Sequence, residues 1–242
     1  MTPRRTLSEG QLTASDSETI ARRELRTFSA STPIVVRHDE DVLGLRFYSK
    51  IANLGLSPRY REWCTQQLVK VLAVMQEETS ASLVVDSDTI LNYPHVWLAE
   101  TGQQLLCIGQ ECREIPFNDS SSFLNIPFRA KLSFVTHHYL WQREILDEIF
   151  PEGKLSVEKW LDYANPKEPE DQRGFKLNDY ETKGAFLSIT HSSRVKFAAW
   201  GNGTGTRGQL THPDVAQPVP SWPLSISYHH YRSANETDPG MF

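Results

Sequence analysis

Apolar residues recur at helical spacing in several stretches of the first 164 residues. One such stretch runs from Asp41 to Leu54, and Gly55 is placed to end the helix in a left-handed conformation. Ser57 and Pro58 then have the pattern of an N-cap and a first helical position. The helix that follows would carry one apolar face, made of Leu68, Val71, Leu72 and Met75. Further helices are predicted at 16–28, 130–150 and 157–161.

Short apolar or alternating runs predict the strands. Three of them follow the second helix, at Ala81–Val85, His95–Ala99 and Gln104–Ile108, and Thr101-Gly102 would form a hairpin turn between the last two. Beyond residue 174 the period changes to two, which predicts strands at Ala185–Thr190, Val195–Ala199 and Leu224–Tyr231. The Gly- and Thr-rich stretch 201–208 is expected to be a surface loop.

This order of elements predicts an α+β fold in which helices pack on an antiparallel sheet, with a β-rich C-terminal extension. A highly charged stretch, 165–173, separates a helix-rich region at 1–164 from a β-rich region at 174–242. The chain length is near the upper end for one compact core, so one domain and two domains are both open.

Charge and composition restrict the partners. The 242 residues include 30 acidic and 25 basic side chains, a formal charge of -5, so the protein repels phosphate backbones and no nucleic acid partner is expected. No run approaches the roughly 18 apolar residues of a membrane span, so no membrane partner is expected either. Three cysteines, an odd number, favour a reducing compartment and a cytoplasmic location. No cofactor is predicted, and the oligomeric state stays open.

Cys64 and His95 are the sharpest candidates for chemistry. Cys64 lies on the predicted helix before the strands, and His95 opens a strand in the run Tyr93-Pro94-His95-Val96-Trp97-Leu98. A thiol becomes a nucleophile when it is held as the thiolate, which a neighbouring imidazole promotes. This pattern predicts a Cys-His pair.

The segment 61–111 resembles the transglutaminase-like cysteine hydrolases and the related arylamine N-acetyltransferases. In that family a helix bearing Cys precedes a strand that begins with His and a strand that bears Asp. The resemblance implies that Cys64 is the nucleophile, that His95 is the general base, and that an acyl group passes from a thioester to water or an amine. The substrate would be a peptide, an amide or a thioester. Where the family has Asp, this sequence has Gln110 and Glu111, so Glu111 would orient the imidazole.

The absence of that Asp favours an alternative from a different class, a non-catalytic protein-interaction module with a degenerate site. The aromatic and His residues of 222–231 would then form a face that binds a protein partner. A second alternative is a metal-dependent hydrolase centred on His137 or His138. On the predicted helix, His138 and Gln142 are the pair at the spacing that lets two side chains share one ion.

Overall fold

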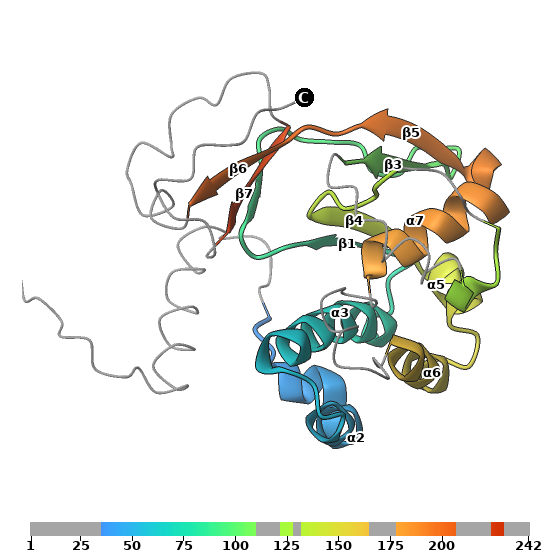
Figure 1. The fold of residues 1–242 in the computed structure, drawn as a ribbon. Helices are drawn as coiled ribbons and strands as arrows, with labels where there is room; N and C mark the ends of the chain where they lie inside the picture. Colours follow the sequence, from blue (N-terminus) through green and yellow to red (C-terminus); the bar gives the residue numbers. More distant parts are fainter. Residues whose placement is uncertain (1–34, 110–121, 128–131, 165–177, 207–223, 230–242) are drawn as a thin grey trace, which may run out of the picture. The chain divides into compact units, whose positions relative to one another are not determined.

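The computed structural model describes residues 35–109, 122–127, 132–164, 178–206 and 224–229, and it has an α+β fold (Figure 1). The chain divides into two compact units, Met1–Val42 and Leu43–Phe242. The packing described below is that of the second unit. The helix predicted at 16–28 and the charged stretch 165–173 lie outside the described residues.

The two helices predicted near the start of the described chain are confirmed. Helix α2 spans Asp39–Asn53 with a kink at Gly44 (φ 71°, ψ 162°), and Gly55 after it has the predicted left-handed conformation (φ 64°). Helix α3 spans Pro58–Gln76, and its N-cap Ser57 accepts a hydrogen bond from the backbone NH of Tyr60 at 3.4 Å. The cap satisfies an amide that has no partner within the first helical turn.

The described residues also include three longer helices and a short 3₁₀ turn. They are α5 (Arg143–Ile149), α6 (Lys154–Ala164), α7 (Asp179–Thr190) and η2 (Ser192–Arg194). Helix α6 includes the predicted helix at 157–161. Helix α5 lies beside α3, α7 and the strand that precedes it, and α6 lies beside α3 (Figure 1).

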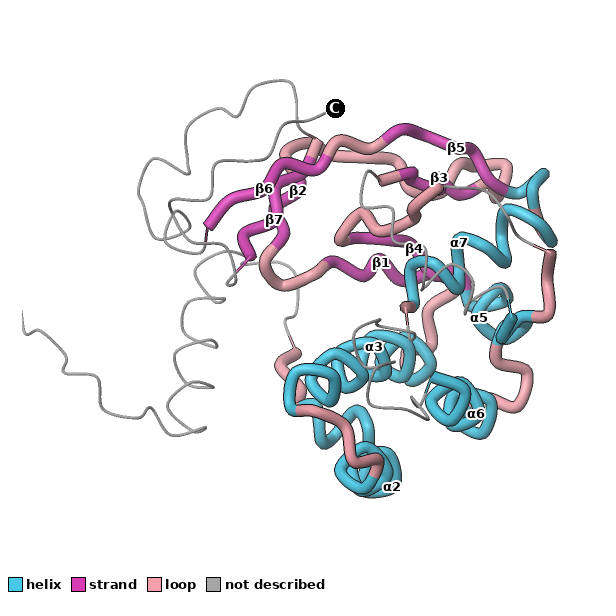
Figure 2. The backbone as a smooth tube through the Cα atoms, viewed as in Figure 1, coloured by secondary structure: helices cyan, strands magenta, loops and turns pink. Residues whose placement is uncertain are grey.

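The strands are β1 (Ala81–Val85), β2 (Thr89–Leu91), β3 (Gln104–Ile108), β4 (His138–Gln142), β5 (Val195–Ala199), β6 (Asn202–Thr206) and β7 (Ser225–His229). The predictions of β1, β3 and β5 are confirmed residue for residue. β1 pairs antiparallel with β4, and β2 pairs antiparallel with β7, whereas β3–β5 and β6–β7 are parallel pairs (Figure 2). The β1–β4 sheet is therefore antiparallel, the β3–β5 sheet is parallel, and the three-stranded β2–β7–β6 sheet is mixed. In the β2–β7 and β3–β5 pairs, a strand before residue 164 pairs with a strand after residue 174.

Four predicted elements were wrong. The helix predicted at 130–150 begins only at Arg143, because His138–Gln142 forms strand β4. This strand is buried on both faces, so its side chains lack the alternation of apolar and polar residues that predicts a strand. The strand predicted at 185–190 is the second half of α7. In 95–99, only Leu98 forms an isolated bridge, with Gln104. The loop predicted at 201–208 contains β6.

Candidate functional site

The structure places Cys64 in the buried face of α3 and His95 in the connection between β2 and β3. Cys64 is 1% exposed, and burial raises the pKa of its thiol to about 12, so the thiol is protonated at neutral pH. His95 packs its ring against Trp97 and Trp200, with centroids 5.2 and 4.7 Å away. Within the described residues no hydrogen bond joins Cys64 to His95. Glu111 lies outside the described residues.

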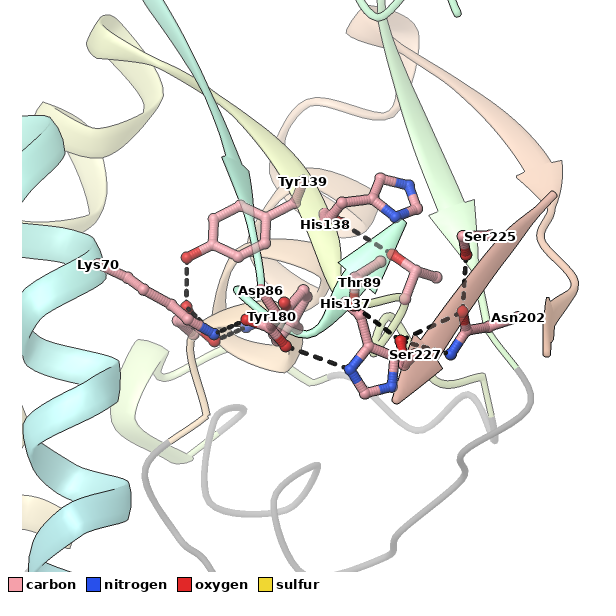
Figure 3. Close-up of polar contacts among 12 residues, drawn as sticks. Lys70, Asp86, Thr89, His137, His138, Tyr139, Tyr180, Asn202, Ser225 and Ser227 are labelled. Atoms are coloured by element: carbon pink, nitrogen blue, oxygen red, sulfur yellow. Dashed lines mark hydrogen bonds and ion pairs between the residues drawn. The ribbon is translucent and has the colours of Figure 1, made fainter. Parts of the chain in front are cut away.

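The two histidines proposed for a metal do not share a helix. His137 precedes β4 and His138 is its first residue, so the helical spacing to Gln142 does not exist. Their side chains point to opposite sides, as Figure 3 shows. Within the described residues, no three His, Cys, Asp or Glu side chains form a group able to hold a metal ion.

Asp86, directly after β1, is the centre of a buried charged cluster (Figure 3). Its carboxylate lies 2.5 Å from the Lys70 amine of α3 and 3.2 Å from Nδ1 of His137. Its backbone NH donates to the His137 carbonyl at 2.9 Å, and His137 has a left-handed φ of 61°. Burial opposes the charge of Asp86, but the bonds and charges of His137 and Lys70 outweigh it and lower the pKa to about 2.

Asp179, the first residue of α7, extends this cluster. The Lys70 amine lies 3.9 Å from its carboxylate, and the Tyr139 hydroxyl of β4 donates to the same oxygen. The side-chain oxygen of Gln67 on α3 accepts a hydrogen bond from the backbone NH of Asp179 at 2.9 Å. Burial opposes the charge of Lys70, but Asp179 and Asp86 outweigh it and raise its pKa. The Lys70 charge is thus matched by two carboxylates.

A small cavity lies beside this cluster, and its innermost space has room for no more than about one water molecule. Strands β3 and β4, helix α7 and two connecting segments provide its wall. The lining residues are Trp97, Leu105, Leu106, Cys107, Phe134, Thr136, His138, Tyr139, Tyr180 and Lys183. The wall is therefore mostly apolar and aromatic with a few polar groups, the composition typical of a ligand site.

His138 is the most unusual polar group of this wall. It is 1% exposed, and neither ring nitrogen has a partner with hydrogen-bonding geometry. Burial lowers its pKa to about 3, against the opposing effect of the Thr136 backbone, so the ring is neutral at pH 7. A neutral imidazole offers one donor and one acceptor. Buried groups of this kind nearly always have partners in native proteins.

Lys183 of α7 places an amine at the same cavity. The residue is 1% exposed, and its Nζ lies 5.2 Å from the ring centroid of Tyr139 and 5.7 Å from that of Trp141. Among the described residues, no acidic side chain lies within ion-pair distance of this amine. Burial lowers its pKa to about 7, although the charges of Cys107 and Asp179 oppose the shift. About half of the amines are therefore unprotonated at neutral pH.

The cavity wall is fixed by hydrogen bonds from α7. The Glu181 carboxylate accepts hydrogen bonds from the Ser133 hydroxyl at 2.9 Å and from the backbone NH of Phe134 at 3.3 Å. Burial raises the pKa of Glu181 to about 7, although these two hydrogen bonds act to lower it. Asn178 caps α7 by accepting the Glu181 NH at 2.9 Å. These contacts hold the segment before β4 against the helix that carries Lys183.

Sequence reasoning missed Lys70, Asp86, Asp179 and Lys183. One signal was available, because Gln67 and Lys70 are three residues apart on the apolar side of α3, an unusual place for a lysine. No local pattern marks Lys183, since the second half of its helix was predicted as a strand and no element was predicted for the first half.

No helix within the described ranges has the length and apolar character needed to cross a membrane. Comparison with protein-family models, with curated protein sequences and with solved structures finds no match for this chain.

Proposed function

We propose that this protein binds a small, uncharged, polar molecule in the cavity between β3, β4 and α7. One observation carries the proposal: the buried imidazole of His138 has no hydrogen-bond partner at either nitrogen and belongs to the wall of this cavity. A ligand with one acceptor and one donor, or with an acceptor alone, would relieve a desolvation penalty of about 1–3 kcal/mol per unsatisfied group.

The charges around the cavity favour a neutral ligand over an anion. The His138 ring is neutral, and the Lys183 amine is only half protonated at pH 7. The one lysine of the neighbouring cluster, Lys70, already lies between Asp86 and Asp179. A carboxylate ligand would therefore enter the field of two acidic side chains with only the partly protonated Lys183 amine to pair with it.

The innermost space of the cavity has room for only one water-sized group of a ligand, such as a carbonyl oxygen. Most of its wall comes from the packed strands β3 and β4 and from helix α7, so the site is largely formed before binding. Ordered water would fill the same space in the absence of a ligand.

The test is a titration of protein labelled with ¹⁵N in its histidine rings, followed by NMR. Acetamide and acetate are the matched probes, because they have the same size and differ in charge. We expect acetamide to shift the His138 ring signals in a saturable way and acetate to leave them unchanged. His191 is the internal control, because it follows the end of α7 that is farther from the cavity. Its Nε2 lies 2.7 Å from a carboxylate oxygen of Glu148.

Two results would overturn the proposal. One is a His138 signal that responds to neither probe, and the other is a response to acetate as strong as the response to acetamide. A shift of His191 equal to that of His138 would show a bulk effect of the additive and would count against binding in the same way.

The thiol hypothesis for Cys64 and His95 and the interaction-module alternative stay predictions. The burial of Cys64 opposes the thiol hypothesis, because a thiol whose pKa is about 12 is a poor nucleophile at neutral pH. The metal alternative rested on the helical spacing of His138 and Gln142, which the strand β4 replaces.

A further inference from the structure

The Lys183 amine differs from that of Lys70, which is largely buried, in having no described acidic side chain within ion-pair distance. Lys70 forms an ion pair with Asp86 at 2.5 Å, whereas the neighbours of Lys183 are the aromatic rings of Tyr139 and Trp141. The faces of these rings attract the ammonium form, but burial without a counter-ion outweighs them and favours the neutral amine, which has the lone pair needed to attack an electrophile.

We propose that Lys183 forms a covalent imine with a small, uncharged aldehyde or ketone bound in the cavity. This inference rests on the proposed function and names its ligand class. Lys183 and His138 line the same small space, so a carbonyl group that reaches His138 also comes close to the amine. The choice of a neutral carbonyl compound, rather than a keto acid, follows from the acidic side chains next to the cavity.

The reaction needs no reagent beyond the protein and the carbonyl compound. The lone pair of Nζ forms a bond to the carbonyl carbon, and the electrons of the C=O double bond pass to oxygen, which takes up a proton. The nitrogen loses a proton to give a neutral carbinolamine. A second proton then adds to the hydroxyl group. The C–O bond breaks, water leaves, and a C=N bond forms.

The cavity supplies groups suited to these proton transfers. Burial, followed by the charges of Asp86 and Asp179, raises the pKa of the Tyr180 hydroxyl, so this group stays protonated and can donate to the carbonyl oxygen. The neutral His138 ring can donate from one nitrogen and accept at the other. Since the wall is largely apolar, little water competes with the bound carbonyl compound.

The groups that face the amine explain why it reacts near neutral pH. Burial lowers the pKa of Lys183 to about 7, while Cys107 on β3 and Asp179 on α7 act in the opposite direction. Tyr139 and His138 of β4 are uncharged at pH 7, because burial raises the pKa of the phenol and lowers that of the imidazole. Cys107, Tyr139 and His138 keep their protonation state between pH 6 and 8, whereas Glu181 of α7, whose pKa is also about 7, changes charge in the same range as the amine.

The experiment is reductive trapping of the full chain with acetaldehyde and sodium cyanoborohydride. The hydride reduces the imine carbon to a stable secondary amine, and peptide mass spectrometry locates the ethyl group. At pH 7 we expect labelling of Lys183 to exceed that of Lys159, whose side chain is 60% exposed, by at least about tenfold, since an ordinary amine is mostly protonated there. The yield at Lys183 should rise with a midpoint near pH 7 and then level off.

The variant Lys183→Arg keeps a cationic side chain but cannot form an imine. It should show no adduct in the cavity, while Lys159 in the same sample reacts as before. If the variant does not fold, the pH profile of the wild-type protein still decides, because Lys183 and Lys159 report from one molecule. Equal labelling of the two lysines at pH 7 would overturn the inference.

The outcomes separate the two proposals. If acetamide shifts the His138 signals but acetaldehyde leaves no adduct on Lys183, the imine inference is wrong and the binding proposal stands. If no probe shifts His138 and no adduct forms, both are wrong. A selective adduct with a midpoint near pH 7 supports both, because the carbonyl compound must enter the cavity to reach a residue that is 1% exposed.

Discussion

Asp86 connects three elements through one carboxylate. Its side chain contacts Lys70 of α3 and His137 before β4, and its own backbone follows β1. Because these partners favour the ionised form, the pKa of Asp86 is about 2, below its ordinary value of 3.8. The stability that this shift contributes is complete above pH 3.8 and is lost as the pH falls through 2.

We therefore expect Asp86→Asn to destabilise the protein by about 3 kcal/mol at pH 7, because the change leaves a buried lysine with one of its two carboxylates. The difference from the wild-type free energy of unfolding should narrow as the pH falls from 4 towards 2. Urea denaturation at several pH values measures both effects.

Asp162→Asn is the matched control for Asp86→Asn. It breaks the ion pair between Lys50 and Asp162, which has a similar distance of 2.8 Å but a carboxylate that is 58% exposed. Its effect should stay below about 1 kcal/mol. A pH-independent loss in Asp86→Asn would show that the carboxylate acts through packing rather than through its charge.

At the scale of elements, Gly184 sets how closely α7 approaches the segment before β4. A Cβ atom added at Gly184 would overlap the ring of Phe134, which is itself buried and lines the cavity. Alanine is favoured over glycine in a helix by about 1 kcal/mol, so propensity and packing act in opposite directions here.

Gly184→Ala should therefore lower the free energy of unfolding by roughly 1–3 kcal/mol, because overpacking outweighs the gain in helix propensity. Chemical denaturation of the variant gives this value directly. Thr190→Ala, at the exposed end of the same helix, is the control and should change stability by less than about 0.5 kcal/mol. Equal or greater stability of Gly184→Ala would mean that α7 and Phe134 can separate at no cost.

The elements that the sequence predicted well have local signals. The Ser57-Pro58 start, the Gly55 end and the apolar runs of β1, β3 and β5 depend on neighbours in the chain. Strand β4 and helix α7 were missed because both are buried on nearly all sides, so their apolar residues show no clear period. The candidate site was missed for the same reason, since Lys183 lies on α7 and His138 on β4.

At the scale of the whole molecule, strands far apart in the sequence depend on each other. β3 has its parallel partner in β5, and β2 has its antiparallel partner in β7. The hydroxyl groups of Thr89 and Ser227 lie 2.7 Å apart across the second pair, and Asn202 of β6 donates to Ser227 at 3.1 Å (Figure 3). The helix-rich region 1–164 therefore includes strands whose partners lie outside it.

We expect a fragment of residues 1–164 to lack a cooperative thermal transition, because β2 and β3 would lose their partners and α7 would no longer cover the cavity. Circular dichroism of the fragment and of the full chain makes the comparison. Addition of a second fragment, 174–242, should restore part of the cooperative transition. Cooperative melting of 1–164 alone would instead establish it as an independent domain, one of the two divisions that the sequence left open.

The pairing of β2 with β7 also affects the synthesis of the protein. Thr89 and Ser227 are 138 positions apart, and ribosomes add roughly 5–20 residues per second, so β2 waits on the order of ten seconds for its partner. During that interval its backbone edge is open to other chains. A cell that makes this protein quickly would thus depend on chaperones that shield strand edges while the chain is still attached to the ribosome.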